Sequence, residues 1–140
     1  MAVRLRLRIR RGQDKEVEVV ALVNSGYEAA GPELLVPPSV AEGLGLYPAL
    51  PRGSEVKEYV LADGSRTRLI RVRGAAEVQV VAEDRATEPK VCDIVIAEGA
   101  EEPLISDKLA DALGVAVIAI GEGLWCFRDE LGRRLRRSAG

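Results

Sequence analysis

The stretch that decides the fold reads Ala21-Leu22-Val23-Asn24-Ser25-Gly26-Tyr27, an apolar run that ends in a short polar turn. The run starts at Val19 and contains only aliphatic residues, which predicts a strand buried on both faces. Asn24, Ser25 and Gly26 are residue types that favour a tight turn. We therefore expect small polar side chains to be held rigidly at the end of a central strand.

The residues before this stretch predict a β-hairpin. Residues 3–10 alternate arginine with aliphatic residues, and residues 16–19 continue the alternation with glutamate and valine. If Arg10 lies opposite Glu16, then Arg8 lies opposite Glu18 and aliphatic residues face each other on the other side. The arginine row could instead bind nucleic acid, but no aromatic residues are interleaved with it, so a solvated sheet face is favoured.

The remainder of the chain predicts a mostly β protein with two helices. Further strands are expected at residues 34–36, 57–61, 66–70, 77–81, 91–96, 115–120 and 124–127, and helices at 38–46 and 104–113. The 115–120 strand is expected to be buried. Ala62-Asp63-Gly64-Ser65 predicts the turn of a second hairpin. Residues 1–127 are interpreted as one domain and residues 128–140, which are rich in charge, as a flexible tail.

Composition narrows the classes of function. A chain of 140 residues with a net charge of −2 is long enough for a core, and the total charge indicates neither a nucleic-acid nor a membrane partner. Histidine is absent, which removes histidine-activated nucleophiles and most zinc sites, so no metal or cofactor is expected. No apolar segment resembles a signal peptide or a membrane span, and we expect a cytoplasmic protein. Cys92 and Cys126 form no CxxC motif, which leaves free thiols and a disulfide both open.

Asn24 is the only asparagine in the chain, and 16 of the 20 basic residues are arginine. Few amides beside many charges indicate a thermophilic source. In such a chain an asparagine before Ser25-Gly26 is an unusual choice for a plain turn. Position 24 therefore either has a chemical role or has been changed from aspartate.

The order of elements resembles the retropepsin-like aspartic proteases, especially their single-domain prokaryotic and archaeal branch. The most specific parts are the stretch quoted first, with Tyr27 as the aromatic residue after the glycine, and Leu35-Val36-Pro37-Pro38-Ser39-Val40-Ala41-Glu42-Gly43-Leu44-Gly45-Leu46. Leu61-Ala62-Asp63-Gly64 matches the flap hairpin of the family. Leu104-Ile105-Ser106 matches two apolar residues and a glycine before the C-terminal helix, with serine in place of the glycine.

This resemblance implies an acid-protease β-barrel with one short C-terminal helix, acting as a homodimer on a peptide or protein. The family builds its dimer from terminal strands, which implies residues 3–10 and 124–127 here. The resemblance assigns the catalytic positions to Asn24, Ser25 and Gly26. It assigns substrate binding to Tyr27, Ala62, Asp63 and Gly64.

Asn24 stands where the family has its catalytic aspartate. In the family two aspartates, one from each chain, share a proton and activate water. An amide cannot act as a general base, so the protein as written is expected to be inactive by this route. Asp63, Asp93 and Asp107 do not follow the central strand and are poor substitutes.

Three interpretations remain. The first is a protease whose aspartate was replaced by asparagine, which deamidation would restore. The second is a noncatalytic pseudoprotease dimer that binds an extended peptide or a partner protein. The third and weakest is a nucleic-acid-binding β module.

Overall fold

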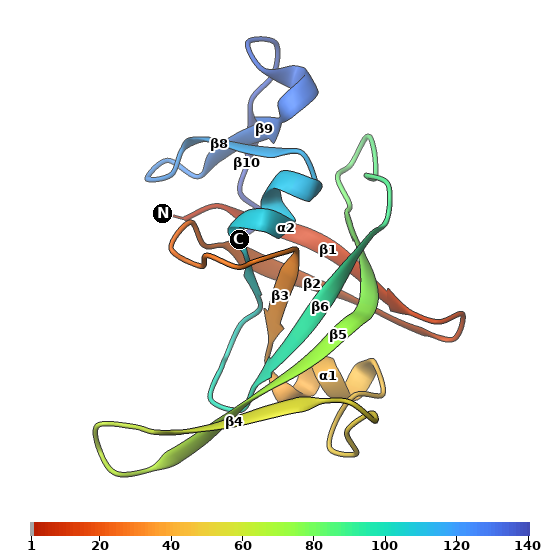
Figure 1. Ribbon diagram of the computed structural model, residues 1–140. Coiled ribbons are helices and arrows are strands. Elements are labelled where there is room, and N and C mark those ends of the chain that lie inside the picture. The colour runs from red at the N-terminus through yellow and green to blue at the C-terminus, as the bar shows by residue number, and fades with distance from the viewer. Residues whose placement is uncertain (1) are drawn as a thin grey trace.

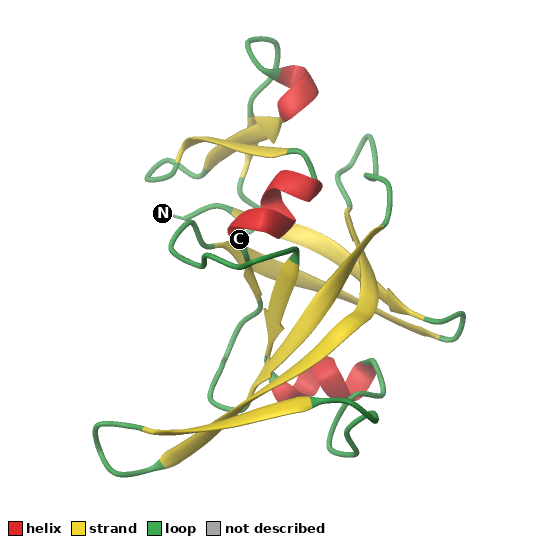
Figure 2. Cartoon of the chain, in the orientation of Figure 1, coloured by secondary structure: helices red, strands yellow, loops and turns green. Residues whose placement is uncertain are grey.

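The computed structural model describes residues 2–140 and contains two β-sheets (Figure 1). The strands of the larger sheet are β1 (Arg4–Arg11), β2 (Lys15–Val23), β3 (Glu33–Val36), β4 (Glu55–Val60), β5 (Arg66–Val80), β6 (Lys90–Ala97) and β7 (Leu104–Ile105). Hydrogen bonds join them in the order β1-β2-β7-β3-β6-β5-β4. A further pairing between β1 and β5 closes all of them except β4 into a barrel. The expected mostly β barrel is thus confirmed (Figure 2).

The smaller sheet and the helical segments lie outside the barrel wall. The smaller sheet contains β8 (Val115–Ala119), β9 (Leu124–Phe127) and β10 (Arg136–Arg137), and the helical segments are α1 (Pro38–Gly43), α2 (Asp107–Ala112) and the 3₁₀ helix η1 (Arg128–Glu130). Strand β9 is the central strand of the smaller sheet. Helix α2 packs against both β3 and β8, so it joins the smaller sheet to the barrel. Within residues 2–140, no helix is long and apolar enough to cross a membrane.

The first hairpin has the register that the sequence predicts. Arg10 lies opposite Glu16, and Arg8 lies opposite Glu18. The closest nitrogen–oxygen distances in these two pairs are 2.7 Å and 3.9 Å. The aliphatic residues of β1, namely Leu5, Leu7 and Ile9, are buried in the barrel. Opposed charges outside and apolar residues inside therefore specify the register together.

Strand β2 is less buried than its apolar run predicts. Only Ala21 is fully buried, while Val19, Val20, Leu22 and Val23 are half-buried. The inner face packs in the barrel, but the outer face has incomplete cover. Helix α1 packs against the start of the inner face, so closely that a Cβ atom at Gly43 would be 2.7 Å from Cγ1 of Val17.

The helix expected at residues 104–113 is shorter in the structure. Leu104 and Ile105 form β7, which pairs in parallel with β2 and antiparallel with β3. Ser106 then caps α2, because its Oγ accepts a hydrogen bond from Leu109 N at 3.2 Å. Pairing on both sides outweighs the helical periodicity of the two apolar residues. The φ angle of Ser106 is −69°, so serine fits without strain where the resemblance expects glycine.

Ser106→Ala is expected to lower the free energy of unfolding by about 1 kcal/mol. The buried Ser106 hydroxyl accepts hydrogen bonds from both Leu109 N and Glu33 N, at 3.2 and 3.1 Å. Its loss leaves both amides without this acceptor. Urea unfolding followed by circular dichroism measures the change. The exposed Ser39 of α1 provides the control, and Ser39→Ala should have little effect; equal effects of the two variants would contradict the capping role.

The second hairpin, β4–β5, has the predicted turn but a longer second strand. Val60 lies opposite Arg66, which leaves residues 61–65 as the turn. The sequence predicts separate strands at 66–70 and 77–81, and this prediction is wrong, since β5 is continuous. A register shift between Val72 and Ala76 replaces the break, and Gly74 in it has a φ of +55°. Such a bulge bends a strand without ending it.

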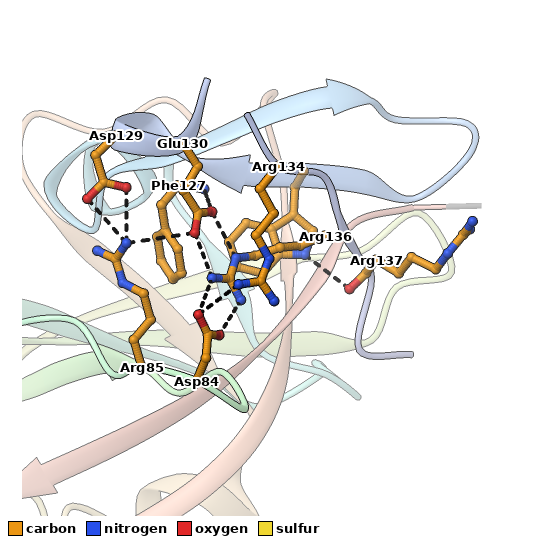
Figure 3. Close-up of polar contacts among 9 residues, drawn as sticks. Asp84, Arg85, Phe127, Asp129, Glu130, Arg134, Arg136 and Arg137 are labelled. Atoms are coloured by element: carbon orange, nitrogen blue, oxygen red, sulfur yellow. Dashed lines mark hydrogen bonds and ion pairs between the residues drawn. The ribbon is translucent and has the colours of Figure 1, made fainter. Parts of the chain in front are cut away.

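The expected flexible tail is not free in the structure. Residues 128–140 contain η1 and β10, which pairs with β9. Arg136, only 8% exposed, donates hydrogen bonds to Asp84 and Glu130 at 2.7 Å each (Figure 3). Its guanidinium carbon lies 4.9 Å from the centre of the Phe127 ring. Asp84 in the loop 82–89 and Glu130 in η1 therefore hold Arg136 in place, although the many arginines of this segment predict disorder.

The folded state is expected to lose stability in acid, because two carboxylates that are paired with arginine become protonated there. The Arg136 guanidinium lowers the pKa of Glu130 from 4.5 to about 2, and Arg68 likewise lowers that of Glu98 to about 2. A folded-state pKa below the unfolded value stabilises the fold above about pH 4.5, and this contribution is lost as pH falls towards 2. Melting temperatures recorded from pH 7 to pH 2 should drop in that window. Glu130→Gln should melt lower at pH 7 and show a smaller drop; a wild-type melting temperature constant from pH 4.5 to 2 would contradict the argument.

The two cysteines are buried free thiols. Cys92 lies in β6 and Cys126 in β9, so they belong to different sheets. Burial raises the pKa of Cys92 to about 12. Of the two states that the sequence leaves open, the structure has free thiols.

The strands expected to form a dimer have neighbours on both sides within the chain. Strand β1 is paired with β2 on one side and with β5 on the other. Strand β9 lies between β8 and β10. The second ladder of each strand is partial, since β5 covers only residues 7–10 of β1 and β10 covers only residues 124–125 of β9. The 115–120 segment also differs from expectation, since Val117 and Ile118 of β8 are 40% and 47% exposed.

Candidate functional site

Asn24, Ser25 and Gly26 form a turn directly after β2, as the sequence predicts. Asn24 N donates to Ile105 O of β7 at 3.2 Å, and Tyr27 N donates to Asn24 O at 3.0 Å. Gly26 N donates to Asn24 Oδ1 at 3.1 Å. Within residues 2–140, this is the only hydrogen bond of the Asn24 side chain. The turn is thus ordered by its own backbone and by β7, with Ser25 and Gly26 exposed.

Asp107 holds the loop that follows this turn. Its Oδ1 accepts from Ala29 N at 3.1 Å, and its N donates to Tyr27 O at 2.9 Å. The same Oδ1 also accepts from Lys108 N, at the start of α2, at 2.7 Å. The additional contact to the loop depends on how α2 packs, and no local sequence signal announces it. Helix α2 therefore positions the residues after Asn24.

A cleft of about 630 Å³ lies between this loop and the base of the β4–β5 hairpin. Its loop side consists of residues 28–31. Its other walls come from β3, β4, β5 and β6, through Glu33, Glu55, Lys57, Tyr59, Leu69, Arg71, Arg73, Asp93 and Val95. The residues of β4 that line it are spaced two apart, as expected for one face of a strand. An elongated groove beside an edge strand can accept an extended chain.

The sequence-predicted site residues are only partly gathered at this cleft. Asn24, Ser25, Gly26 and Tyr27 precede its loop wall, but they do not line it. Ala62, Asp63 and Gly64 lie at the tip of the hairpin, away from the loop (Figure 1). Asp63 bonds within the turn, accepting from Ser65 N and Oγ, and these bonds lower its pKa. In a single chain, therefore, the hairpin tip and the Asn24 turn do not meet.

A charged cluster at the cleft was missed by the sequence analysis. Glu33, 4% exposed, forms an ion pair with Arg71 Nη1, which lies 3.3 Å from Asp93 Oδ2. The register places Glu33 beside Asp93 on neighbouring parallel strands. Burial, followed by the nearby Glu33 charge, raises the pKa of Tyr27. The one available signal was a glutamate at the start of the apolar run 34–36, with its partner 38 residues further along the chain.

The carboxylates considered as substitutes for a catalytic aspartate all have other partners. Asp63 bonds to Ser65, and Asp107 to backbone amides. Asp93 bonds to Arg71 and to Gly74 N, the latter at 2.8 Å. None of them bonds to the Asn24 side chain. The turn itself offers an amide, a hydroxyl and backbone groups, which can form hydrogen bonds but cannot supply a general base near neutral pH.

Comparison with solved structures identifies the architecture. The retroviral protease-like domain of Ddi1 from Leishmania major matches with a TM-score of 0.51 and 16% identity, over 98% of this chain and 94% of that one. The chain has a retropepsin-like fold. No protein-family model and no curated protein matches the sequence.

Proposed function

We propose that the protein binds an extended polypeptide segment in this cleft, as a homodimer, and does not hydrolyse it. The observation that carries the proposal is the cleft itself, which lies between the loop following Asn24 and the edge strand β4. Within residues 2–140, β4 pairs only with β5, so the backbone groups on its outer edge are available to an added strand. An extended peptide can pair with such an edge while alternate side chains enter pockets.

The absence of hydrolysis follows from the chemistry of position 24. Peptide hydrolysis by a pair of carboxylates needs one ionised group to activate water and one protonated group to stabilise the oxyanion. Two Asn24 side chains supply neither. Their amides can donate hydrogen bonds to a peptide carbonyl and accept them from a peptide amide, which supports binding alone.

The proposal includes a homodimer because a single chain leaves the Asn24 turn and the tip of the β4–β5 hairpin uncovered. Ser25 and Gly26 are exposed in the single chain, and the hairpin tip is exposed as well. The retropepsin-like fold of the chain supports a second copy as the missing wall.

The binding step is tested with a variant that fills the cleft. Ala30 lines the cleft and is exposed, so Ala30→Trp should block it without disturbing the core. The probe is a tryptic digest of denatured casein, and binding is read by amide hydrogen exchange at residues 28–31 and 55–60. Wild-type protein should be protected there with every peptide left intact, while Ala30→Trp should not be protected.

Ala139→Trp provides the matched control, since Ala139 is exposed and lies outside the cleft. It should behave like the wild type. Equal protection in the wild type and in Ala30→Trp, or none in either, would overturn the proposal.

A further inference from the structure

The backbone amide that follows Asn24 is free to react. Within residues 2–140, Ser25 N donates no hydrogen bond, and Ser25 is exposed to solvent. This nitrogen closes a five-membered ring when it bonds to Cγ of the preceding asparagine. Water can therefore reach and deprotonate the backbone nitrogen that is placed to attack the Asn24 side chain.

The side-chain carbonyl that such an attack would reach is already polarised. Gly26 N donates a hydrogen bond to Asn24 Oδ1 at 3.1 Å. When a nitrogen adds to Cγ, negative charge collects on Oδ1, and a fixed N–H donor beside that oxygen stabilises the charge as in an oxyanion hole. The donor that holds the Asn24 side chain in the turn thus also stabilises the intermediate of its attack.

The leaving group of the side chain is free as well. Within residues 2–140, Asn24 Nδ2 has no hydrogen-bond partner, so no contact opposes its departure. The backbone of Asn24 is held at both ends, because its N donates to Ile105 O at 3.2 Å and its O accepts from Tyr27 N at 3.0 Å. Holding the reacting groups in one ordered turn lowers the entropic cost of ring closure.

We propose that Asn24 is a self-modification site whose side chain is converted to a carboxylate in the folded protein. Ser25 N loses its proton to water and bonds to Cγ, and the Cγ–Nδ2 bond breaks, which releases ammonia and leaves a succinimide. Water then opens the ring. Cleavage of the bond from Cγ to Ser25 N gives aspartate, whereas cleavage at the main-chain carbonyl gives isoaspartate. The net change consumes one water and releases one ammonia.

Conversion changes what the cleft can do. Peptide binding belongs to the asparagine form, and this consequence rests on the proposed function, since it acts in the same cleft and dimer. A pair of carboxylates that shares a proton needs one from each chain, so only dimers converted in both chains can activate water. Hydrolysis should therefore begin after a lag and rise as the square of the aspartate fraction. The only asparagine of an amide-poor chain stands where its loss supplies a carboxylate.

Mass spectrometry of aged protein tests the conversion. The full chain is kept at neutral pH below its melting temperature, and the tryptic fragment 16–52 is followed with time. A synthetic peptide of residues 19–31, which lacks the contact between Asn24 N and β7, is the reference. Asn24 should convert several-fold faster in the folded chain than in the peptide. Conversion in the folded chain at the rate of the peptide, or more slowly, would overturn the proposal, because the turn would then protect the amide.

Variants of the exposed Ser25 test which atom attacks. Ser25→Gly removes the Cβ atom beside the attacking nitrogen and should speed conversion several-fold, whereas Ser25→Val adds a branched Cβ and should slow it several-fold. Asn24→Gln is the control, because its longer side chain would have to close a six-membered ring, and it should remain unmodified. Circular dichroism confirms that each variant is folded. Equal conversion rates in Ser25→Gly and Ser25→Val would contradict attack by Ser25 N.

Activity measurements separate this proposal from the proposed function. Aged wild-type protein should cleave the casein digest in proportion to the square of its aspartate fraction, and aged Asn24→Gln should cleave nothing. Conversion to aspartate without any cleavage would overturn the change from binding to hydrolysis. A chain that converts and cleaves as expected, but whose fresh form gains no protection from peptide in amide hydrogen exchange, would refute peptide binding by the asparagine form alone.

Discussion

Asn24→Asp is expected to hydrolyse unstructured peptides, with a rate at least about 10²-fold above that of the wild type. Aspartate is nearly the same size as asparagine, and its carboxylate can accept the existing hydrogen bond from Gly26 N, so the turn should be retained. In a dimer, the two new carboxylates would share a proton and provide both the base and the acid. Cleavage of the casein digest, read by mass spectrometry between pH 3 and pH 7, measures the gain.

Asn24→Ala is the control for this experiment, because it removes the amide without adding a carboxylate. It should remain inactive like the wild type. Activity should fall at high pH, where both carboxylates ionise. An Asn24→Asp protein that folds and dimerises but cleaves nothing would show that the cleft lacks more than the carboxylate, and would leave binding as its only activity.

Arg136→Ala is expected to lower the free energy of unfolding by about 2 kcal/mol. This value is below the range for a fully buried ion pair, because the Asp84 side chain is 40% exposed and its charge is partly solvated. The substitution removes the hydrogen bonds to Asp84 and Glu130 (Figure 3) and the contacts of the guanidinium with the Trp125 and Phe127 rings. Glu130, whose side chain is 14% exposed, then keeps Phe127 N at 3.0 Å and Arg85 Nη1 at 3.9 Å. Urea unfolding followed by tryptophan fluorescence measures the loss, since Trp125 is the only tryptophan.

The adjacent Arg137 supplies the matched control. It is exposed, and within residues 2–140 its side chain makes no hydrogen bond or ion pair, while its backbone pairs with β9 and its oxygen accepts from Trp125 Nε1 at 3.1 Å. Arg137→Ala should therefore change the unfolding free energy little. Equal losses in the two variants would mean that charge in this segment, and not the buried contact, stabilises the fold.

The first hairpin and the Asn24 turn could be read from the sequence because their determinants are local. Alternation with a period of two specifies which face is buried, and glutamates spaced to match the arginines of β1 leave one register. The turn after Val23 likewise follows from residue types that bond to their own backbone.

Other elements could not be read because partners distant in sequence decide them. Leu104 and Ile105 have helical spacing, yet they form a strand because β2 and β3 leave a gap between them. Arg136 resembles part of a solvated tail until the folded loop brings Asp84 to it. The cluster of Glu33, Arg71 and Asp93 combines three strands, so none of its members stands out locally.

The sequence by itself determined that the chain is mostly β, that a polar turn ends its second strand, and that position 24 lacks a carboxylate. These properties depend on residue identity and on neighbours within a few positions. Only the tertiary structure decided which strand edges remain open, which charges meet at the cleft and how α2 holds the loop after Asn24. Edges and clefts are properties of packing, because a backbone group is free or paired according to which distant segment lies beside it.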